Sequence, residues 1–382
     1  MKDLRLPLEQ ARRDHLYRRP LVLDSSQQPE VVVDGRPMLG FCSNDYLGLA
    51  ADSRVAAAFR RGIDRWGSGS GAAHLVTGHS RAHQQLEQEL AEFTGRERTL
   101  LFSNGYMANL AIITTLLGRG DTVIEDRLDH ASLIDGGRLS GARLRRFPHA
   151  DLDTAREQLQ KATGEKLLAV DGVFSMDGDL ADLPALAVLC QQQDAWLLVD
   201  DAHGLGVLGN NGGGSLEHWR LDAQQVPILM GTLGKAFGTA GAFVAGSGDL
   251  IELLMQKART WIFTTALPAA VAEATRCSLE ILHEENWRRE RLQELVAKFH
   301  EGIVRLGFAS PPSTTPIQPL IAGSAETALE WSGLLAEQGI LVTAIRPPTV
   351  PQGSARLRIT FSASHTDEHL QRLLSALERL RP

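Results

Sequence analysis

The stretch Ala195-Trp196-Leu197-Leu198-Val199-Asp200-Asp201-Ala202-His203 decides the fold of this chain. Its apolar run 196–199 is typical of a buried strand, and the run ends at the carboxylate of Asp200. Further along, Lys235 lies among small residues in Thr232-Leu233-Gly234-Lys235-Ala236-Phe237-Gly238. Ligands of open α/β sheets bind at the carboxyl ends of strands. We therefore expect Asp200, His203 and Lys235 to lie at such a sheet edge.

Short apolar runs alternate with amphipathic segments in the region that leads to this stretch. The predicted strands are residues 99–102, 122–125, 144–147, 167–170 and 196–199. The predicted helices that separate them lie near 106–117, 131–139, 152–162 and 184–193. Such alternation is typical of a mostly parallel central sheet covered by helices. The predicted fold class is therefore α/β, with a smaller α+β domain at the C-terminus.

Three parts of the chain are predicted from the change in pattern. Residues 1–40 form an N-terminal arm with a basic helix and a short strand at 31–33. Residues 41–282 form a large domain. Residues 283–382 form a small domain that starts with a long charged helix, breaks at Ser310-Pro311-Pro312-Ser313 and continues as strand, helix, strand, strand, helix.

Composition argues against several classes of protein. The 382 residues are 43% hydrophobic, and 39 basic against 46 acidic residues give a net charge of −7, which argues against nucleic-acid binding. The three cysteines lack metal-ligand spacing, so neither a disulfide framework nor a metal site is expected. Without a signal-peptide core or a long apolar run, we expect no membrane association and a cytoplasmic location. Basic residues cluster at 12–19 and 138–146, where an acidic partner or the phosphates of CoA could bind.

The lysine, aspartate and hydroxyl groups of the two opening stretches are those that a pyridoxal 5'-phosphate (PLP) enzyme needs. A lysine can form a Schiff base with the cofactor aldehyde, and a carboxylate can hold the pyridine nitrogen protonated. A hydroxyl such as that of Thr232 can bind the phosphate. Each residue also has a structural alternative, either a solvated loop lysine or a carboxylate that caps the next helix. The three groups in this order favour the PLP site.

A competing dinucleotide-binding motif is incomplete. Gly204-Leu205-Gly206-Val207-Leu208-Gly209 matches G-x-G-x-x-G after a predicted strand. That fingerprint requires a helix that holds the pyrophosphate at its N-terminus. The following Asn210-Asn211-Gly212-Gly213-Gly214 cannot sustain a helix. A nicotinamide-dependent dehydrogenase is therefore disfavoured.

Further candidate residues lie where predicted strands meet predicted helices. Gly105 and Tyr106 open a helix, so their backbone N–H groups could bind a phosphate. His130 could stack on the pyridine ring, whereas its neighbour Asp129 could simply cap a helix. Ser175 could bind the phenolic oxygen of the cofactor, or it could be a structural residue of a turn.

Two arginines near the C-terminus could bind a substrate carboxylate. In Arg356-Leu357-Arg358-Ile359-Thr360 the alternation places both guanidinium groups on one face of a strand. Their planar geometry suits bidentate binding of a carboxylate. A solvated face on an edge strand is the structural alternative.

Taken together, these residues resemble the α-oxoamine synthases, a fold-type I family of PLP enzymes, over nearly the whole chain. The matching stretches are Phe41-Cys42-Ser43-Asn44-Asp45-Tyr46-Leu47-Gly48-Leu49, Asp129-His130-Ala131-Ser132, Gly172-Val173-Phe174-Ser175-Met176-Asp177-Gly178, 200–204 and 232–235. The sequence departs from the family at Gly71-Ala72-Ala73-His74, where many relatives carry Gly-Gly-Ser-Arg, so the role of this loop stays open. The segment between His203 and Lys235 is also a few residues longer than in the family.

The resemblance implies a role for each matched residue. The implied PLP-binding residues are Lys235 at the aldehyde, Asp200 at the pyridinium, His130 on the ring, Ser175 and His203 at the phenolic oxygen, and Gly105, Tyr106 and Thr232 at the phosphate. Lys235, His130, Asp200 and His203 are the implied catalytic residues. The implied substrate-binding residues are Asn44 and Arg358 at the amino-acid carboxylate, His130, Thr349, and Arg18 at the acyl entrance, where Arg19 is a rival. Family members are homodimers.

The resemblance also implies a decarboxylative condensation of an amino acid with an acyl thioester. The stretch Ala344-Ile345-Arg346-Pro347-Pro348-Thr349-Val350-Pro351 is most similar to members that condense L-alanine with a pimeloyl thioester, on CoA or acyl carrier protein, in biotin biosynthesis. The alternative is a glycine- or serine-using relative of the 2-amino-3-ketobutyrate ligase, 5-aminolevulinate synthase or serine palmitoyltransferase type. A PLP-binding transcriptional regulator is disfavoured by the acidic charge and by the lack of an added helix-turn-helix segment.

Overall fold

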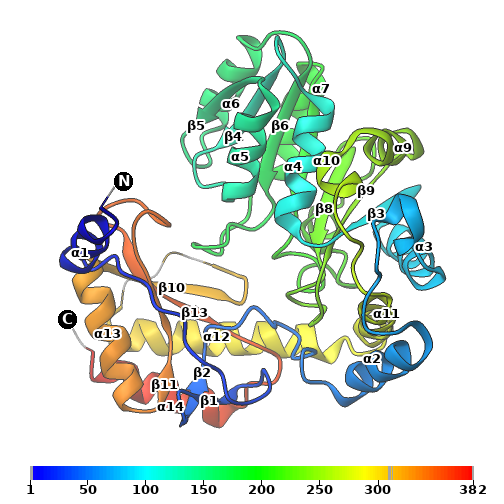
Figure 1. Ribbon diagram of the computed structural model, residues 1–382. Coiled ribbons are helices and arrows are strands. Elements are labelled where there is room, and N and C mark those ends of the chain that lie inside the picture. The colour runs from blue at the N-terminus through cyan, green and yellow to red at the C-terminus, as the bar shows by residue number, and fades with distance from the viewer. Residues whose placement is uncertain (1–2, 309–310, 312, 381–382) are drawn as a thin grey trace. The chain divides into compact units, whose positions relative to one another are not determined.

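Figure 1 shows a computed structural model of the chain, which describes residues 3–308, 311 and 313–380. The chain forms two compact units. The large unit comprises residues 51–175 and 180–289, and the small unit comprises the described residues of 1–50, 176–179 and 290–382. These units differ from the predicted boundaries 1–40, 41–282 and 283–382. The N-terminal region joins the C-terminal region because β2 (Arg36–Gly40) pairs in parallel with β11 (Ile340–Leu341).

A seven-stranded sheet with the order β3-β9-β8-β7-β6-β4-β5 forms the centre of the large unit. Its strands are β3 (Arg98–Phe102), β4 (Thr122–Asp126), β5 (Arg143–Phe147), β6 (Lys166–Asp171), β7 (Trp196–Asp200), β8 (Ile228–Thr232) and β9 (Ala242–Gly246). Only β9 runs antiparallel to its neighbours in this sheet, β3 and β8. The prediction of a mostly parallel sheet is confirmed, and all five predicted strands are present. Strands β8 and β9 were not predicted.

The four predicted helices connect these strands and cover the sheet. They are α4 (Gly105–Leu116), α5 (Ala131–Ser140), α6 (Leu152–Gln160) and α7 (Leu183–Gln192). α4 is apolar on nearly all sides, which is typical of a helix inside a core. Its buried residues pack with strand residues in one cluster that includes Ala108, Ala111, Ile112, Ile113, Leu100, Val123 and Leu198. Each large aliphatic side chain buried there contributes about 1.5–3 kcal/mol. This packing fixes the first turn of α4 at the carboxyl edge of the sheet.

A second group of helices completes the large unit. Its long members are α2 (Ser53–Trp66), α3 (Arg81–Thr94) and α11 (Ala269–Glu284), and its short ones are α8 (Gly214–Trp219), α9 (Gly248–Lys257), α10 (Arg259–Ile262) and the π-helical turn His74–Gly78. α2 and α11 approach closely, since a Cβ on Gly62 would lie 2.7 Å from the Cα of Ala270.

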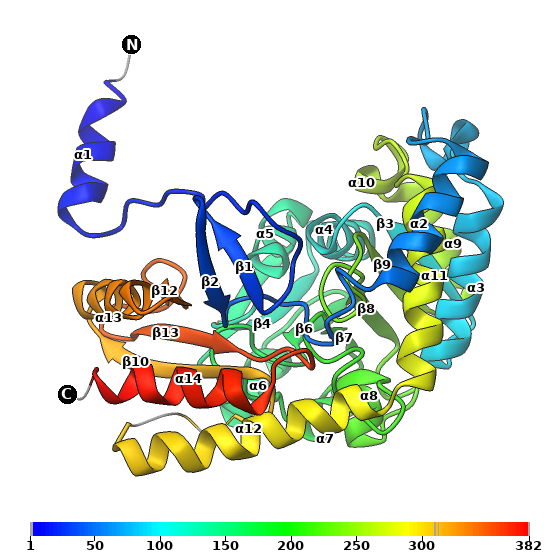
Figure 2. The same cartoon turned by 90° about the horizontal axis from the view of Figure 1, so that it is seen from below.

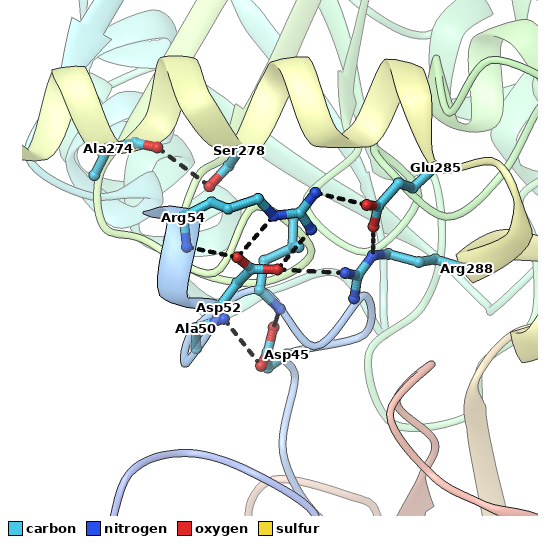
Figure 3. A network of polar contacts seen from close by, with 9 residues as sticks. Asp45, Ala50, Asp52, Arg54, Ala274, Ser278, Glu285 and Arg288 are labelled. Atoms are coloured by element: carbon cyan, nitrogen blue, oxygen red, sulfur yellow. Dashed lines mark hydrogen bonds and ion pairs between the residues drawn. The ribbon is translucent and has the colours of Figure 1, made fainter. Parts of the chain in front are cut away.

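Four charged side chains tie the start of α2 to the end of α11 (Figure 3). Arg54 contacts Asp52 at 2.8 Å and Glu285 at 2.6 Å. Arg288 contacts Glu285 at 2.7 Å and Asp52 at 3.4 Å. The four groups therefore form a closed ring of alternating charge, which we call the α2–α11 charge ring. Asp52 is also the N-cap of α2, because its carboxylate accepts a hydrogen bond from the backbone N–H of Arg54.

The small unit contains two three-stranded sheets, β1-β2-β11 and β10-β13-β12. Its other strands are β1 (Glu30–Val33), β10 (Ile317–Gly323), β12 (Thr343–Ile345) and β13 (Ala355–Thr360), and its helices are α1 (Arg5–Arg13), α13 (Ala325–Glu337) and α14 (Asp367–Glu378). α12 (Trp287–Leu306) begins in the large unit and continues into the small one, where it lies beside α14 (Figure 2), with Lys298 and Asp367 paired at 2.8 Å. Ser310 and Pro312 of the predicted break lie outside the described residues. In the described parts of the chain, no helix combines the length and apolar character needed to cross a membrane.

Candidate active site

Asp200 ends β7, the middle strand of the large sheet. Its side chain is buried, with 5% of its surface exposed. The carboxylate accepts a hydrogen bond from Nδ2 of Asn109 at 2.7 Å and another from the backbone N–H of Ala202 at 3.1 Å. These two donors fix the orientation of the carboxylate at the carboxyl edge of the sheet.

Lys235 and His203 lie at the same edge. Lys235 follows β8, the strand next to β7, and His203 lies in the turn that follows Asp200. Nζ of Lys235 is 2.7 Å from Nε2 of His203. Adjacent parallel strands therefore bring together the lysine, the aspartate and the histidine that the sequence analysis singled out.

His130 is the N-cap of α5 and follows β4. Its Nδ1 lies 2.6 Å from Oγ of Ser132 and accepts a hydrogen bond from the backbone N–H of Ser132 at 3.3 Å. Oγ of Ser132 in turn accepts from Nδ2 of Asn109 at 2.8 Å. The histidine is thereby connected to Asp200 through Ser132 and Asn109. Burial lowers the pKa of His130; the charge of Asp200 opposes this shift and that of Lys235 adds to it.

Asp129 does not cap α5, so the structural alternative considered for it is wrong. Its carboxylate accepts hydrogen bonds from the backbone N–H groups of Asp126, at 2.8 Å, and of Asp171, at 2.9 Å. Asp126 ends β4 and Asp171 ends β6, and these strands are neighbours. The side chain of Asp129 therefore links the ends of two neighbouring strands.

Three more carboxyl groups are buried beside Asp200. Burial raises the pKa of both Asp129 and Asp171 well above the usual range, and a neighbouring carboxylate adds to each shift, Asp171 for Asp129 and Asp200 for Asp171. Burial raises the pKa of Asp201 to about 7. Because ionised carboxylates at these positions would repel one another, a positive charge placed beside Asp200 would be stabilised.

The predicted phosphate-binding residues lie at the starts and ends of elements of the large unit. α4 begins at Gly105, and its N-cap Asn104 accepts a hydrogen bond from the N–H of Met107. The N–H groups of Gly105 and Tyr106 belong to the first turn, for which a helix supplies no acceptors. The phenol of Tyr106 donates to Asp135. Thr232 ends β8, and its hydroxyl donates to the carbonyl of Gly241 at 3.1 Å.

Ser175 and the G-x-G-x-x-G motif follow two neighbouring strands of the large sheet, β6 and β7. Ser175 follows β6 and is half-buried. The G-x-G-x-x-G stretch forms turns after β7, and the next helix, α8, starts only at Gly214. No helix follows the third glycine directly, so the fingerprint for a dinucleotide is not met.

The predicted carboxylate-binding residues form a cluster within the small unit. Arg358 donates to Oδ1 of Asn44 at 3.1 Å and to the hydroxyl of Tyr46 at 3.4 Å. Arg356, on the same strand, pairs with Asp177. Both arginines are buried, with 4% and 6% of their surfaces exposed, and β13 is the central strand of its sheet. The alternative of a solvated edge face is therefore excluded.

The structure distinguishes Arg18 from its rival Arg19. A guanidinium nitrogen of Arg18 donates to the hydroxyl of Thr349 at 3.3 Å, so two predicted substrate-binding residues touch each other. Arg19 instead pairs with Asp34 at 3.4 Å. All four residues belong to the small unit.

The loop that departs from the family pattern places His74 in a buried cluster of aromatic rings. His74 stacks on Trp261 with ring centroids 5.1 Å apart, and its Nδ1 lies 2.9 Å from Nδ1 of His79. Burial lowers the pKa of His74 to about 3, and the nearby His83 and His79 add to the shift. A neutral packing residue thus stands where many relatives carry an arginine.

Comparison with known proteins defines the class to which this site belongs. Residues 36–377 match the family described as aminotransferase class I and II. The chain belongs to this family, whose fold is that of the fold-type I PLP-dependent enzymes.

Curated relatives narrow the class further. A protein of Thioalkalivibrio sulfidiphilus is 61% identical over 381 residues, which are 99% of this chain and 97% of that protein. One of Stutzerimonas stutzeri is 60% identical and covers 98% of this chain and 96% of its own length. Both bear the name 8-amino-7-oxononanoate synthase. Within its family, the chain groups with the 8-amino-7-oxononanoate synthases.

Solved structures of similar proteins support the fold and the cofactor. A serine palmitoyltransferase from S. paucimobilis with a bound PLP–myriocin aldimine superposes with a TM-score of 0.94 at 30% identity, covering 99% of this chain and 96% of that one. An 8-amino-7-oxononanoate synthase from Francisella tularensis gives a TM-score of 0.79 at 33% identity, covering 90% and 97%.

The residues of the large unit fit PLP. Asp200 is a buried, oriented carboxylate in an environment that favours an added positive charge, and a protonated pyridine ring supplies one. The amine of Lys235 lies at the same edge. The first-turn N–H groups of α4 suit a phosphate. PLP is therefore the cofactor of this protein.

Proposed function

We propose that the protein catalyses the 8-amino-7-oxononanoate synthase reaction of biotin biosynthesis. In it, L-alanine condenses with a pimeloyl thioester, CO₂ leaves, and 8-amino-7-oxononanoate and a free thiol form. The relatives at 60–61% identity over nearly the whole chain support this reaction over its sister activities. The observation that carries the chemistry is the convergence of Lys235, His203 and Asp200 at one sheet edge.

The residues of the large unit would hold the cofactor and move protons. Lys235 would bind the aldehyde, Asp200 would pair with the ring nitrogen, and His130 would pack on the ring. When bound, PLP supplies an electron sink for the negative charge that develops at Cα of the amino acid. The amine of Lys235 would take the Cα proton of alanine and later return a proton to the product. At the phosphate end, we assign the N–H groups of Gly105 and Tyr106 and the hydroxyl of Thr232.

The phenolic oxygen of the cofactor is assigned to His203 and Ser175. His203 already lies against the amine of Lys235, so the same imidazole could direct this amine. Ser175 follows β6, whose strand end lies next to that of β7. A hydroxyl and an imidazole at this oxygen would fix the tilt of the ring.

The residues of the small unit would bind the substrates. Arg358 and Asn44 would hold the carboxylate of L-alanine, because a guanidinium and an amide can donate to its two oxygens. Arg18 and Thr349 would bind the acyl substrate at its entrance, and their mutual contact supports a common role. The acyl donor is a thioester of CoA or of acyl carrier protein. The basic clusters at 12–19 and 138–146 support either anionic donor.

We also propose a homodimer that works in the cytoplasm. The family resemblance supports the dimer, and the proposed acyl donors support the location. Sedimentation equilibrium of the PLP-loaded protein tests the dimer, and a monomer across the working concentration range would refute it.

The reaction is tested by an absorbance titration of the purified PLP-loaded protein. L-Alanine, glycine and L-serine are added separately, and pimeloyl-CoA or the pimeloyl carrier protein follows. A cofactor band that moves with alanine at the lowest concentration, followed by formation of 8-amino-7-oxononanoate by mass spectrometry, is expected. A preference for glycine or serine would move the protein to a sister activity. No cofactor band after addition of PLP would refute the proposal.

A further inference from the structure

Asn109 lies at the centre of the hydrogen bonds that link the proposed cofactor-binding residues. It is fully buried on α4, and its Nδ2 donates to Oδ2 of Asp200 at 2.7 Å and to Oγ of Ser132 at 2.8 Å. Ser132 is fully buried on α5 and contacts Nδ1 of His130. Two helices and one strand therefore contribute to a single chain of polar contacts.

We propose that Asn109 and Ser132 are positioning residues: Asn109 orients the carboxylate of Asp200, and Ser132, held by Asn109, keeps the proton of His130 on Nε2. The proposal rests on the PLP chemistry assigned above and deepens it. It concerns residues that touch the proposed catalytic groups rather than the substrate.

The direction of the hydrogen bonds follows from the charge of Asp200. An ionised carboxylate only accepts, so the amide of Asn109 must turn its nitrogen toward Asp200. The same nitrogen carries a second hydrogen, which points to Oγ of Ser132. Oδ1 of Asn109 is then left without a hydrogen-bond partner among the described residues. Leaving a buried acceptor unpaired costs about 1–3 kcal/mol. The fold tolerates this cost at a side chain that reaches both Asp200 and Ser132.

The proton of the Ser132 hydroxyl is directed by the same argument. Oγ already accepts from Asn109, so its own hydrogen is free to point at Nδ1 of His130. The backbone N–H of Ser132 points at the same nitrogen. Nδ1 thus faces two donors, which places the ring proton on Nε2.

The charged surroundings of His130 agree with a neutral ring. Burial and the charge of Lys235 lower its pKa, against the charge of Asp200. Asp171, whose carboxylate accepts from the backbone N–H of His130, has its own pKa raised by burial. A neutral imidazole of fixed tautomer presents one fixed pattern of donor and acceptor to a cofactor ring.

The experiment uses the full-length protein with four substitutions. Ser132→Ala removes the hydroxyl, and Asn109→Asp replaces the donor with an acceptor of the same shape. Ser140→Ala is the matched control on α5, because its hydroxyl bonds only backbone groups: it donates to the carbonyl of Gly137 and accepts from the N–H of Ala142. Thr114→Ala is the control on α4, where the hydroxyl bonds the carbonyl of Leu110.

Two readouts do not depend on turnover. The first is the ¹⁵N spectrum of the His130 ring before and after PLP is added, which reports the tautomer. Wild type and both controls should show one tautomer with the proton on Nε2, and Ser132→Ala should show a mixture. The second is the pH titration of the visible band of bound PLP. Asn109→Asp should add a pH-dependent step, because two carboxyl groups at this separation cannot both ionise.

Kinetics supply the third readout. For Ser132→Ala we expect kcat to fall by about 10-fold, and for Asn109→Asp by about 10- to 100-fold. The loss of one hydrogen bond to a charged group gives a change of this size. KM for L-alanine should stay within about twofold, because the proposed carboxylate-binding residues are untouched.

The outcomes separate this inference from the proposed function. A wild type without a PLP band refutes the function. A wild type with the band, together with Ser132→Ala and Asn109→Asp spectra that match those of the controls, refutes the positioning role. The role is also refuted if the wild-type ring carries its proton on Nδ1.

Discussion

Replacement of Arg358 by alanine tests the assignment of the substrate carboxylate most directly. The guanidinium is buried and donates to Asn44 at 3.1 Å and to Tyr46 at 3.4 Å. Tyr46 is fully buried, and burial raises the pKa of its phenol, against the charge of Arg358, so it remains a neutral acceptor. These two contacts orient the guanidinium of Arg358, whose planar fork can donate to both oxygens of a carboxylate.

The size of the effect follows from the contacts that would be lost. Removing one partner of a buried, charged hydrogen-bonded pair costs about 2–4 kcal/mol, because the other partner is left without compensation. At about 1.4 kcal/mol for each factor of ten, KM for L-alanine should rise about 30- to 700-fold. The affinity for PLP should not change, since the proposed cofactor-binding residues belong to the other unit. Arg358→Lys should recover only part of the loss, because an ammonium group lacks the planar fork of a guanidinium.

Steady-state kinetics with varied L-alanine, together with a fluorescence titration of PLP, measure both quantities. Arg356→Gln is the matched control, because Arg356 lies two positions away on β13 and pairs with Asp177 within the small unit. We expect its KM for alanine to stay within about threefold of wild type. An alanine KM in Arg358→Ala that matches the control would refute the reasoning and assign the carboxylate to another residue.

Three further predictions concern the lysine, a buried carboxyl and the acyl donor. Lys235→Ala should abolish turnover while PLP still binds without covalent attachment; measurable turnover by product mass spectrometry would contradict the assignment. Burial raises the pKa of Glu125 to about 7, so its folded form holds a proton that its unfolded form releases. Stability contributed by this proton is present below the unfolded pKa of about 4.3 and is lost as pH rises through about 7. Glu125→Gln should therefore gain stability relative to wild type between about pH 5 and pH 8 in urea unfolding, and an unchanged difference would count against the shift. If the basic clusters bind the acyl donor, added salt should raise KM for the pimeloyl carrier protein, and a salt-independent KM would contradict this.

The sequence predicted five strands of the large sheet but not β8 and β9, for a physical reason. Buried parallel strands such as β6 and β7 are continuous apolar runs, which are easy to recognise between helices. β8 (Ile228–Thr232) and β9 (Ala242–Gly246) are just as short and apolar but are separated by the glycine-rich lysine loop instead of a helix. The alternation that identified the other strands therefore fails at this point. It fails where the chain forms the proposed active site.

The sequence revealed the reactive residues of the proposed site but not Asn109, which carries no reactive group. Lys235, Asp200 and His203 carry reactive groups close to one another in the sequence, so their types and order suggested a site. Asn109 lies on a helix whose other buried residues are apolar, and nothing local distinguishes it from a tolerated polar residue in a core. Its role becomes visible only when β7, α4 and α5 are placed together, because each supplies one member of the hydrogen-bond chain. A buried asparagine in an otherwise apolar helix beside a strand-end carboxylate is the signal that could have identified it, since a buried amide requires partners.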